Sequence, residues 1–106
     1  MPKYMWKVSY SADGVRGIVK QGAVDRAAQI GQITAANGGT VESFYFAFGD
    51  TDVYVIADLP GDTTAAAIAL AVGASGTGAI ETVKLHTPAE VDEARGMQTG
   101  YVPPGA

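Results

Sequence analysis

The sequence predicts a single α+β domain, with a four-stranded antiparallel sheet and both long helices on one face. Segments in which apolar and polar residues alternate, as in half-buried strands, are separated by segments with helical apolar spacing. They follow one another as strand, helix, strand, strand, helix, strand and a short final helix. The 106 residues suffice for one domain, and an apolar content of 47% with only 17% charged residues excludes a disordered chain.

The N-terminal third predicts one strand followed by one long helix. Apolar and polar residues alternate over residues 3–10, the pattern of a strand with one buried face. After a turn at residues 11–14, the apolar spacing becomes helical from Val15 onward. It continues to Asn37-Gly38-Gly39, where glycine readily adopts the left-handed conformation that ends a helix. We therefore expect a single helix between these points.

The next two strands are expected to form a hairpin. The first spans residues 40–48 and is apolar on both faces, with Phe44, Phe46 and Phe48 on one and Val41, Tyr45 and Ala47 on the other. Gly49-Asp50-Thr51 is a tight connection. Residues 52–58 are therefore expected to pair with the preceding strand as its antiparallel neighbour.

A second helix and a fourth strand follow the hairpin. The Pro-Gly pair at residues 60–61 ends the third strand. One of the polar residues at 62–64 is expected to cap an alanine-rich helix that reaches about Ala74. Glycines then end this helix, and the pattern over residues 79–86 predicts the last strand.

The C-terminal segment begins with a strong helix start. The residues from Thr87 to Glu90 combine an N-cap threonine, a proline at the first helical position and a glutamate three residues on, which predicts a helix to about Arg95. We expect one domain over residues 1–95 and an irregular tail over residues 96–106. The element order is that of a ferredoxin-like βαββαβ fold. Right-handed crossovers place the first and third strands in the middle of its sheet.

The uncovered face of such a sheet is expected to be an interface between copies. Two helices cover only one face, yet the third strand is apolar on both, with Val53, Val55 and Ala57 on one side and Tyr54 and Ile56 on the other. Burying one large apolar side chain contributes about 1.5–3 kcal/mol, so a second apolar face in water is costly. We predict a homo-oligomer, most simply two sheets packed face to face in an α+β barrel. In the alternative, the C-terminal helix and tail cover this face within the chain.

The hairpin resembles the signature of the GYD-domain proteins. Residues 44–56 read FYFAFGDTDVYVI and are followed by Leu-Pro-Gly-Asp at 59–62, and Gly14-Val15-Arg16 and Arg26 also match. The resemblance covers about residues 3–90. Thr51 stands where the family has the tyrosine of its name, so no role for an aromatic hydroxyl is carried over. The resemblance implies a small bacterial or archaeal protein of the dimeric α+β-barrel type, with no established reaction.

Composition narrows the classes of function. The net charge of -4 disfavours a nucleic-acid partner. The absence of cysteine excludes a thiolate nucleophile and a Cys-ligated metal, and the single histidine, His86, cannot form a two-His site. We therefore expect neither metal nor cofactor. No stretch has the character of a signal peptide or a membrane span, so we expect a cytoplasmic protein without a membrane partner.

Arg26 is the first candidate ligand-binding residue. It falls on the apolar stripe of the predicted first helix, where a guanidinium requires a carboxylate or an anionic ligand. Asp50 and Asp52 in the hairpin are the natural partners within the chain, and they would lock the helix to the turn. The functional alternative is an anion-binding Arg26 at the mouth of a site, with Asp52 beside it.

A second candidate site is a small cationic patch on the open face of the sheet. Lys7 on the first strand would be joined there by Lys84 and His86 on the fourth, a set that suits an anionic oxygen. His86 would then be able to shuttle a proton. In the alternative, His86 only caps the start of the last helix, beside Thr87. Tyr54 belongs to an aromatic set on the strands, together with Tyr4, Trp6, Tyr10 and Tyr45. We expect most of this set in the core or an interface, and a cavity lined by some of its members would accept a flat apolar ligand.

Three functions are compatible with these residues. The first is an oligomeric module that binds or senses a small anionic or aromatic metabolite, which the lack of a nucleophile–base pair favours. The second is a cofactor-independent enzyme of the α+β-barrel type, such as an isomerase, decarboxylase or monooxygenase, with His86 as acid or base. The third is a structural assembly protein without a ligand.

Overall fold

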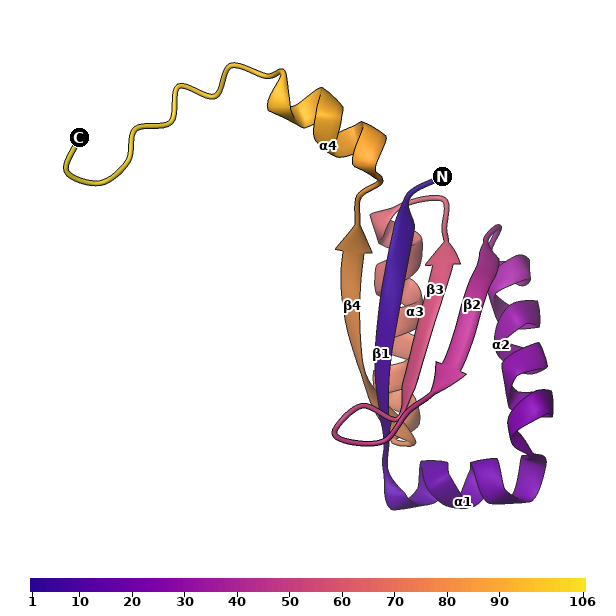
Figure 1. Cartoon of the computed structure of the whole chain (residues 1–106). Helices are drawn as coiled ribbons and strands as arrows, with labels where there is room; N and C mark the ends of the chain where they lie inside the picture. Colours follow the sequence, from indigo (N-terminus) through magenta and orange to yellow (C-terminus); the bar gives the residue numbers. More distant parts are fainter.

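A computed structural model describes all of residues 1–106, and its centre is a four-stranded antiparallel sheet (Figure 1). The strands are β1 (Lys3–Tyr10), β2 (Thr40–Phe46), β3 (Val53–Asp58) and β4 (Gly78–Leu85). Their order across the sheet is β2-β3-β1-β4. The predicted ferredoxin-like α+β fold, with the first and third strands in the middle, is therefore confirmed.

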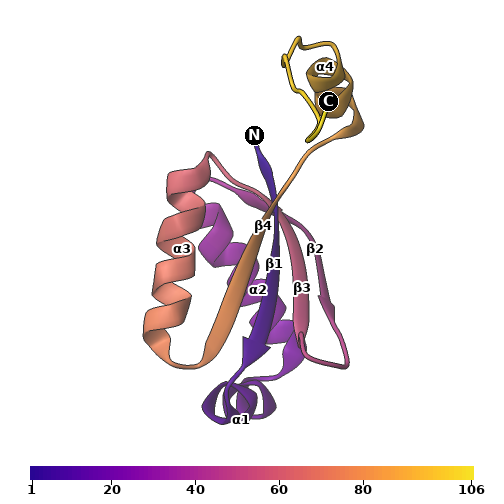
Figure 2. The same cartoon turned by 90° about the vertical axis from the view of Figure 1, so that its left-hand side faces the viewer.

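Two long helices lie on the same face of this sheet (Figure 2). They are α2 (Ala23–Ala36) and α3 (Asp62–Ser75). The first packs on β2 and the second on β4, which are the two edge strands. The central strands β1 and β3 consequently lie beneath the space between the helices.

The prediction of a single first helix is wrong. The segment forms two helices, α1 (Ala12–Gln21) and α2, which are separated at Gly22. Gly22 has a φ of 95°, a conformation that side chains with a Cβ rarely adopt. Its N–H donates to the Ile18 carbonyl at 2.8 Å, and its own carbonyl accepts from the Arg26 N–H at 3.1 Å. One glycine thus ends one helix and begins the next. As a result α1 lies across the end of the sheet while α2 runs along it (Figure 1).

The predicted faces of the second strand also need correction. Val41 pairs with Ala57, whereas Ser43 pairs with Ile56, so the register shifts between them. This irregularity moves Val41 to the face of Phe44, and both pack against the core. The strand ends at Phe46, two residues before the expected end, and the N–H of Ala47 donates across the turn to the Asp52 carbonyl at 2.9 Å.

The hydrophobic core lies between the sheet and the two long helices. Its buried members are Tyr4, Trp6, Val53, Val55, Ala57, Leu59 and Ala65. The cross-strand pairs Tyr4–Ala57 and Trp6–Val55 place β1 and β3 side chains on this face. The opposite face, which we call the open face, presents Met5, Ile56 and Tyr54 at the next register positions.

The C-terminal arm, residues 86–106, projects away from the sheet (Figures 1 and 2). It contains α4 (Pro88–Arg95), which begins with the predicted capping box: Thr87 Oγ1 accepts from the Glu90 N–H and Glu90 Oε1 accepts from the Thr87 N–H. Every residue of the arm is exposed. The alternative in which the arm covers the open face of its own chain is therefore wrong. None of the helices combines the length and apolar character required to cross a membrane.

Replacing Gly22 with alanine is expected to destabilise the domain by about 1–3 kcal/mol, because the Cβ forces the break into a strained conformation. Urea unfolding followed by circular dichroism measures the change. Gly17→Ala is the matched control, since Gly17 lies inside α1 with open space around it. That control is expected to leave stability unchanged or raise it by about 0.5–1 kcal/mol. Equal losses in both variants would contradict the role given to Gly22.

Candidate functional site

A cavity of about 420 Å³ lies between α2 and α3 over the middle of the sheet. We call it the interhelical cavity. Trp6 and Val55 belong to its floor on the central strands, while Ala67 and Ala71 line it from α3. The two helices lie apart because each packs on an edge strand. Alanine side chains on α3 are too short to bridge the space between them. The alanine-rich sequence of α3 therefore leaves space where larger residues would close a core.

The indole of Trp6 is the first unusual feature of this cavity. The side chain is only 3% exposed, yet its Nε1 has no hydrogen-bond partner. A buried donor left unpaired destabilises the fold by about 1–3 kcal/mol. The sequence places Trp6 in the aromatic set of which some members were expected to line a cavity, and Trp6 does line this one. Only the tertiary structure shows that its N–H has no acceptor.

Arg26 is the second unusual feature. Its Nη1 donates to Gln29 Oε1 at 3.0 Å, but its Nε is buried without a partner. Arg26 makes no ion pair within the chain, so the predicted pairing with Asp50 or Asp52 is wrong. The Asp52 carboxylate instead accepts from the backbone N–H of Tyr10 at 2.8 Å, which fastens the hairpin turn to β1. Arg26 is half-buried, and its guanidinium has no anionic partner within the chain although its Nε is shielded from water.

Most other polar side chains of the cavity bond within their own helix or turn. Thr34 Oγ1 donates to the Ile30 carbonyl, and Asn37 Nδ2 donates to the Ile33 carbonyl. Ser75 Oγ donates to the Val72 carbonyl, at 2.6 Å. The unsatisfied side-chain groups of the cavity are thus two N–H donors, Trp6 Nε1 and Arg26 Nε.

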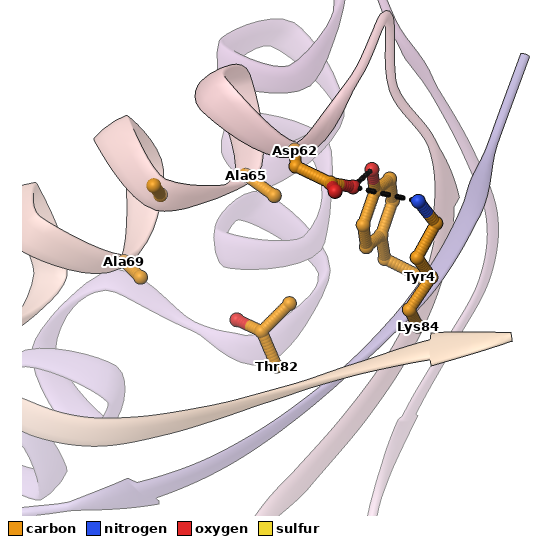
Figure 3. Close-up of a pocket in the computed structure, with 7 residues that line it drawn as sticks. Tyr4, Asp62, Ala65, Ala69, Thr82 and Lys84 are labelled. Atoms are coloured by element: carbon orange, nitrogen blue, oxygen red, sulfur yellow. Dashed lines mark hydrogen bonds and ion pairs between the residues drawn. The ribbon is translucent and has the colours of Figure 1, made fainter.

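A second, more open hollow of about 310 Å³ lies beside the start of α3 (Figure 3). Tyr4 Oη donates to Asp62 Oδ1 at 2.5 Å, and Lys84 Nζ donates to the same oxygen at 2.9 Å. The ammonium also stands 5.9 Å from the centre of the Tyr4 ring. Asp62 was one of the expected helix caps, but Gly61 holds that position without a side-chain bond. The carboxylate instead links α3 to β1 and β4 through these two hydrogen bonds.

The electrostatics of this Tyr4–Asp62–Lys84 cluster favour a structural role. Hydrogen bonds from Tyr4 and then Lys84 lower the pKa of Asp62, and the bond to Asp62 raises the pKa of Tyr4. The hydrogen bond that Lys84 donates to Asp62 raises the pKa of Lys84. Each group is thereby held more firmly in its ordinary charge state, whereas an acid or base at neutral pH requires a pKa moved toward 7.

The sequence pattern of the GYD domain matches residues 4–94. The chain belongs to the GYD-domain family. This confirms the resemblance of the hairpin, and the match contains all of the sheet except Lys3, both long helices and the interhelical cavity. No curated protein and no solved structure matches the chain.

The cationic patch expected on the open face is not present in this GYD domain. Lys84 lies opposite Tyr4 in the β1–β4 pairing and therefore shares the helix-covered face. Lys7 lies opposite Glu81 on the open face and is 3.4 Å from its carboxylate. The register of β4 against β1, which the sequence does not specify, separates the two lysines.

The remaining candidates lie outside the interhelical cavity. His86 is exposed beyond the end of β4, with Nδ1 at 3.7 Å from the Glu90 carboxylate. Tyr54 lies on the open face opposite Tyr45. Of the six ligand-binding residues that the sequence suggested, only Arg26 lines this cavity, and Lys84 lines the smaller hollow.

Asp62→Asn is expected to destabilise the GYD domain at neutral pH, because the carboxylate loses its ion pair with Lys84. The lowered pKa of Asp62 means that its stabilisation is present above its ordinary value of 3.8 and is lost as the pH falls through the folded-state pKa. The raised pKa of Lys84 means that the stabilisation contributed by Lys84 is present below its ordinary value of 10.5. This stabilisation is lost as the pH rises through the folded-state pKa of Lys84.

Urea unfolding at about pH 3 and about pH 7 tests this dependence. The difference in free energy of unfolding between wild type and Asp62→Asn should be smaller at the lower pH. Asp92→Asn on the projecting α4 is the control, and it should unfold like wild type at both values. If Asp62→Asn lowers the free energy of unfolding by the same amount at both pH values, the stabilisation does not come from the ionised Asp62 carboxylate.

Proposed function

We propose that this GYD domain is an oligomeric module that binds a small organic molecule, an anionic or aromatic metabolite, in the interhelical cavity. The observation that carries the proposal is the pair of buried, unpaired donors, Trp6 Nε1 and Arg26 Nε, in an apolar cavity of about 420 Å³. Cavities of about 300–1,000 Å³ with mostly apolar walls and few polar groups are typical of small-molecule sites. A ligand acceptor would satisfy donors that the fold leaves unpaired.

An enzymatic role for His86 has less support. The imidazole is exposed, lies near Glu90 on the start of the arm and lines neither of the two cavities described above. An acid or base acts on groups within hydrogen-bond reach, and neither of these two cavities would hold a substrate against His86. The cavity therefore supports binding more directly than it supports His86-dependent turnover.

The oligomer is the second part of the proposal, and it uses the open face. Tyr45 is 71% exposed and Tyr54 is 37% exposed, on neighbouring strands and directly opposite each other. Met5 and Ile56 continue this apolar surface across the central strands. A second copy packed sheet to sheet would bury these side chains, which the C-terminal arm of the same chain does not cover.

Ala71→Phe is expected to abolish ligand binding, because the added ring fills the interhelical cavity from α3. Native mass spectrometry first reports any molecule retained from expression. Titration with octanoate or 1-octanol, followed by the fluorescence of Trp6, the only tryptophan, then reports occupancy. Ala74→Phe is the matched control, since Ala74 lies on the same helix but lines neither cavity. Failure of both probes to bind the wild type, or equal binding by both variants, would overturn the proposed site.

Tyr45→Glu and Tyr54→Glu are each expected to dissociate the oligomer, because the interface would have to bury an unpaired carboxylate. Native mass spectrometry and light scattering measure the assembly size. Phe48→Glu is the control, since Phe48 is fully exposed in the hairpin loop beyond β2. If both tyrosine variants keep the size of the wild type, the open face is not the interface.

A further inference from the structure

We infer that the ligand of the interhelical cavity is an organic monocarboxylate with an apolar body, bound through Trp6 and Arg26. This inference rests on the proposed function and specifies its ligand. Both unsatisfied groups, Trp6 Nε1 and Arg26 Nε, are donors without any acceptor character. The ligand must therefore present acceptor atoms, which excludes an ammonium group because it only donates. An alcohol oxygen can accept, but it carries no negative charge to offset the guanidinium.

The charge of the cavity selects an anion. Arg26 is the only charged residue among those that line it, and no aspartate or glutamate contributes to the walls. A guanidinium group is a cation with five N–H donors and no acceptor. A carboxylate bound there would supply both the missing counter-charge and a charge-assisted hydrogen bond.

The start of α2 adds to this preference. Arg26 lies in the first turn of the helix, where the backbone dipole disfavours a cation and favours an anion. Gly22 caps the helix without a side chain, so no internal oxygen accepts from this end. Asp25 shares the turn, but it is exposed and makes no ion pair with Arg26. An anion held by Arg26 would offset the unfavourable placement of the guanidinium.

The number of donors and the nature of the walls define the rest of the ligand. Two N–H groups match the two oxygens of one carboxylate, whereas a phosphate dianion would call for more donors and a second cation. Thirteen of the 18 lining residues are hydrophobic, among them Ile30, Ile68 and Val53. A ligand body that is polar or carries further charges would be desolvated against these walls without compensation.

Octanoate and 1-octanol test the inference, because they share an apolar chain and differ in the group offered to the donors. We expect octanoate to bind at least about tenfold more tightly at neutral pH, as is typical of hydrogen bonds to a charged group. Arg26→Gln should abolish this preference by weakening octanoate alone. Trp6→Phe, which removes only the N–H and keeps an aromatic ring, should weaken octanoate several-fold when measured by calorimetry. Arg16→Gln is the control, since Arg16 is exposed and pairs with Asp13 on α1.

The outcomes separate this inference from the proposed function. If 1-octanol binds the wild type as tightly as octanoate, and Ala71→Phe blocks both, the cavity binds ligands but the carboxylate assignment is wrong. The assignment also fails if Arg26→Gln leaves the preference unchanged while its thermal unfolding shows a folded domain. If neither probe binds the wild type, the proposed function fails, and the inference fails with it.

Discussion

The pairing of β1 with both β3 and β4 fixes the face on which each side chain of the site lies. Trp6 stands opposite Val55 on one side and Thr82 on the other, so its indole lies under the space between the helices. The same pairing sets Tyr4 beside Lys84 and turns Lys7 to the open face. Because side chains alternate along a strand, a shift of one residue would exchange the two faces and dismantle the cavity floor.

The interhelical cavity follows from where the helices rest on this sheet. Both long helices pack on edge strands, and α3 offers alanines where larger residues would reach across. Two of the residues that line this space, Trp6 and Arg26, each have a buried donor that the chain does not satisfy. Local violations of good packing and hydrogen bonding tend to mark functional sites, since a protein without a ligand there gains nothing from them. The Tyr4–Asp62–Lys84 cluster differs in this respect, because each of its groups has a partner.

The two faces of the sheet therefore differ in the side chains they carry and in what covers them. The helix-covered face contains the core and the cavity, whereas the open face carries exposed tyrosines and apolar side chains. The C-terminal arm extends away from the sheet and does not cover the open face (Figure 1). All residues of the arm are exposed. In the function proposed above, binding and assembly use opposite surfaces of the domain, so substitutions on one surface are expected to leave the other unchanged.

The sequence by itself determined the strands, the order of the elements and the start of α4. These depend on the alternation of residues 3–10, the Pro-Gly pair at residues 60–61 and the capping box at Thr87, all of which act between near neighbours. It also singled out Arg26, because a guanidinium on an apolar stripe is chemically conspicuous wherever the helix packs.

The tertiary structure decided everything that depends on distant pairing. The break at Gly22 left the apolar spacing intact on both sides, so periodicity alone predicted one helix. The shift after Val41 and the register of β4 assigned side chains to faces, and this separated Lys7 from Lys84. The absence of an acceptor for Trp6 became visible only when both helices were in place. Local patterns encode backbone conformation, whereas register and the spacing of helices depend on side chains far apart in the chain.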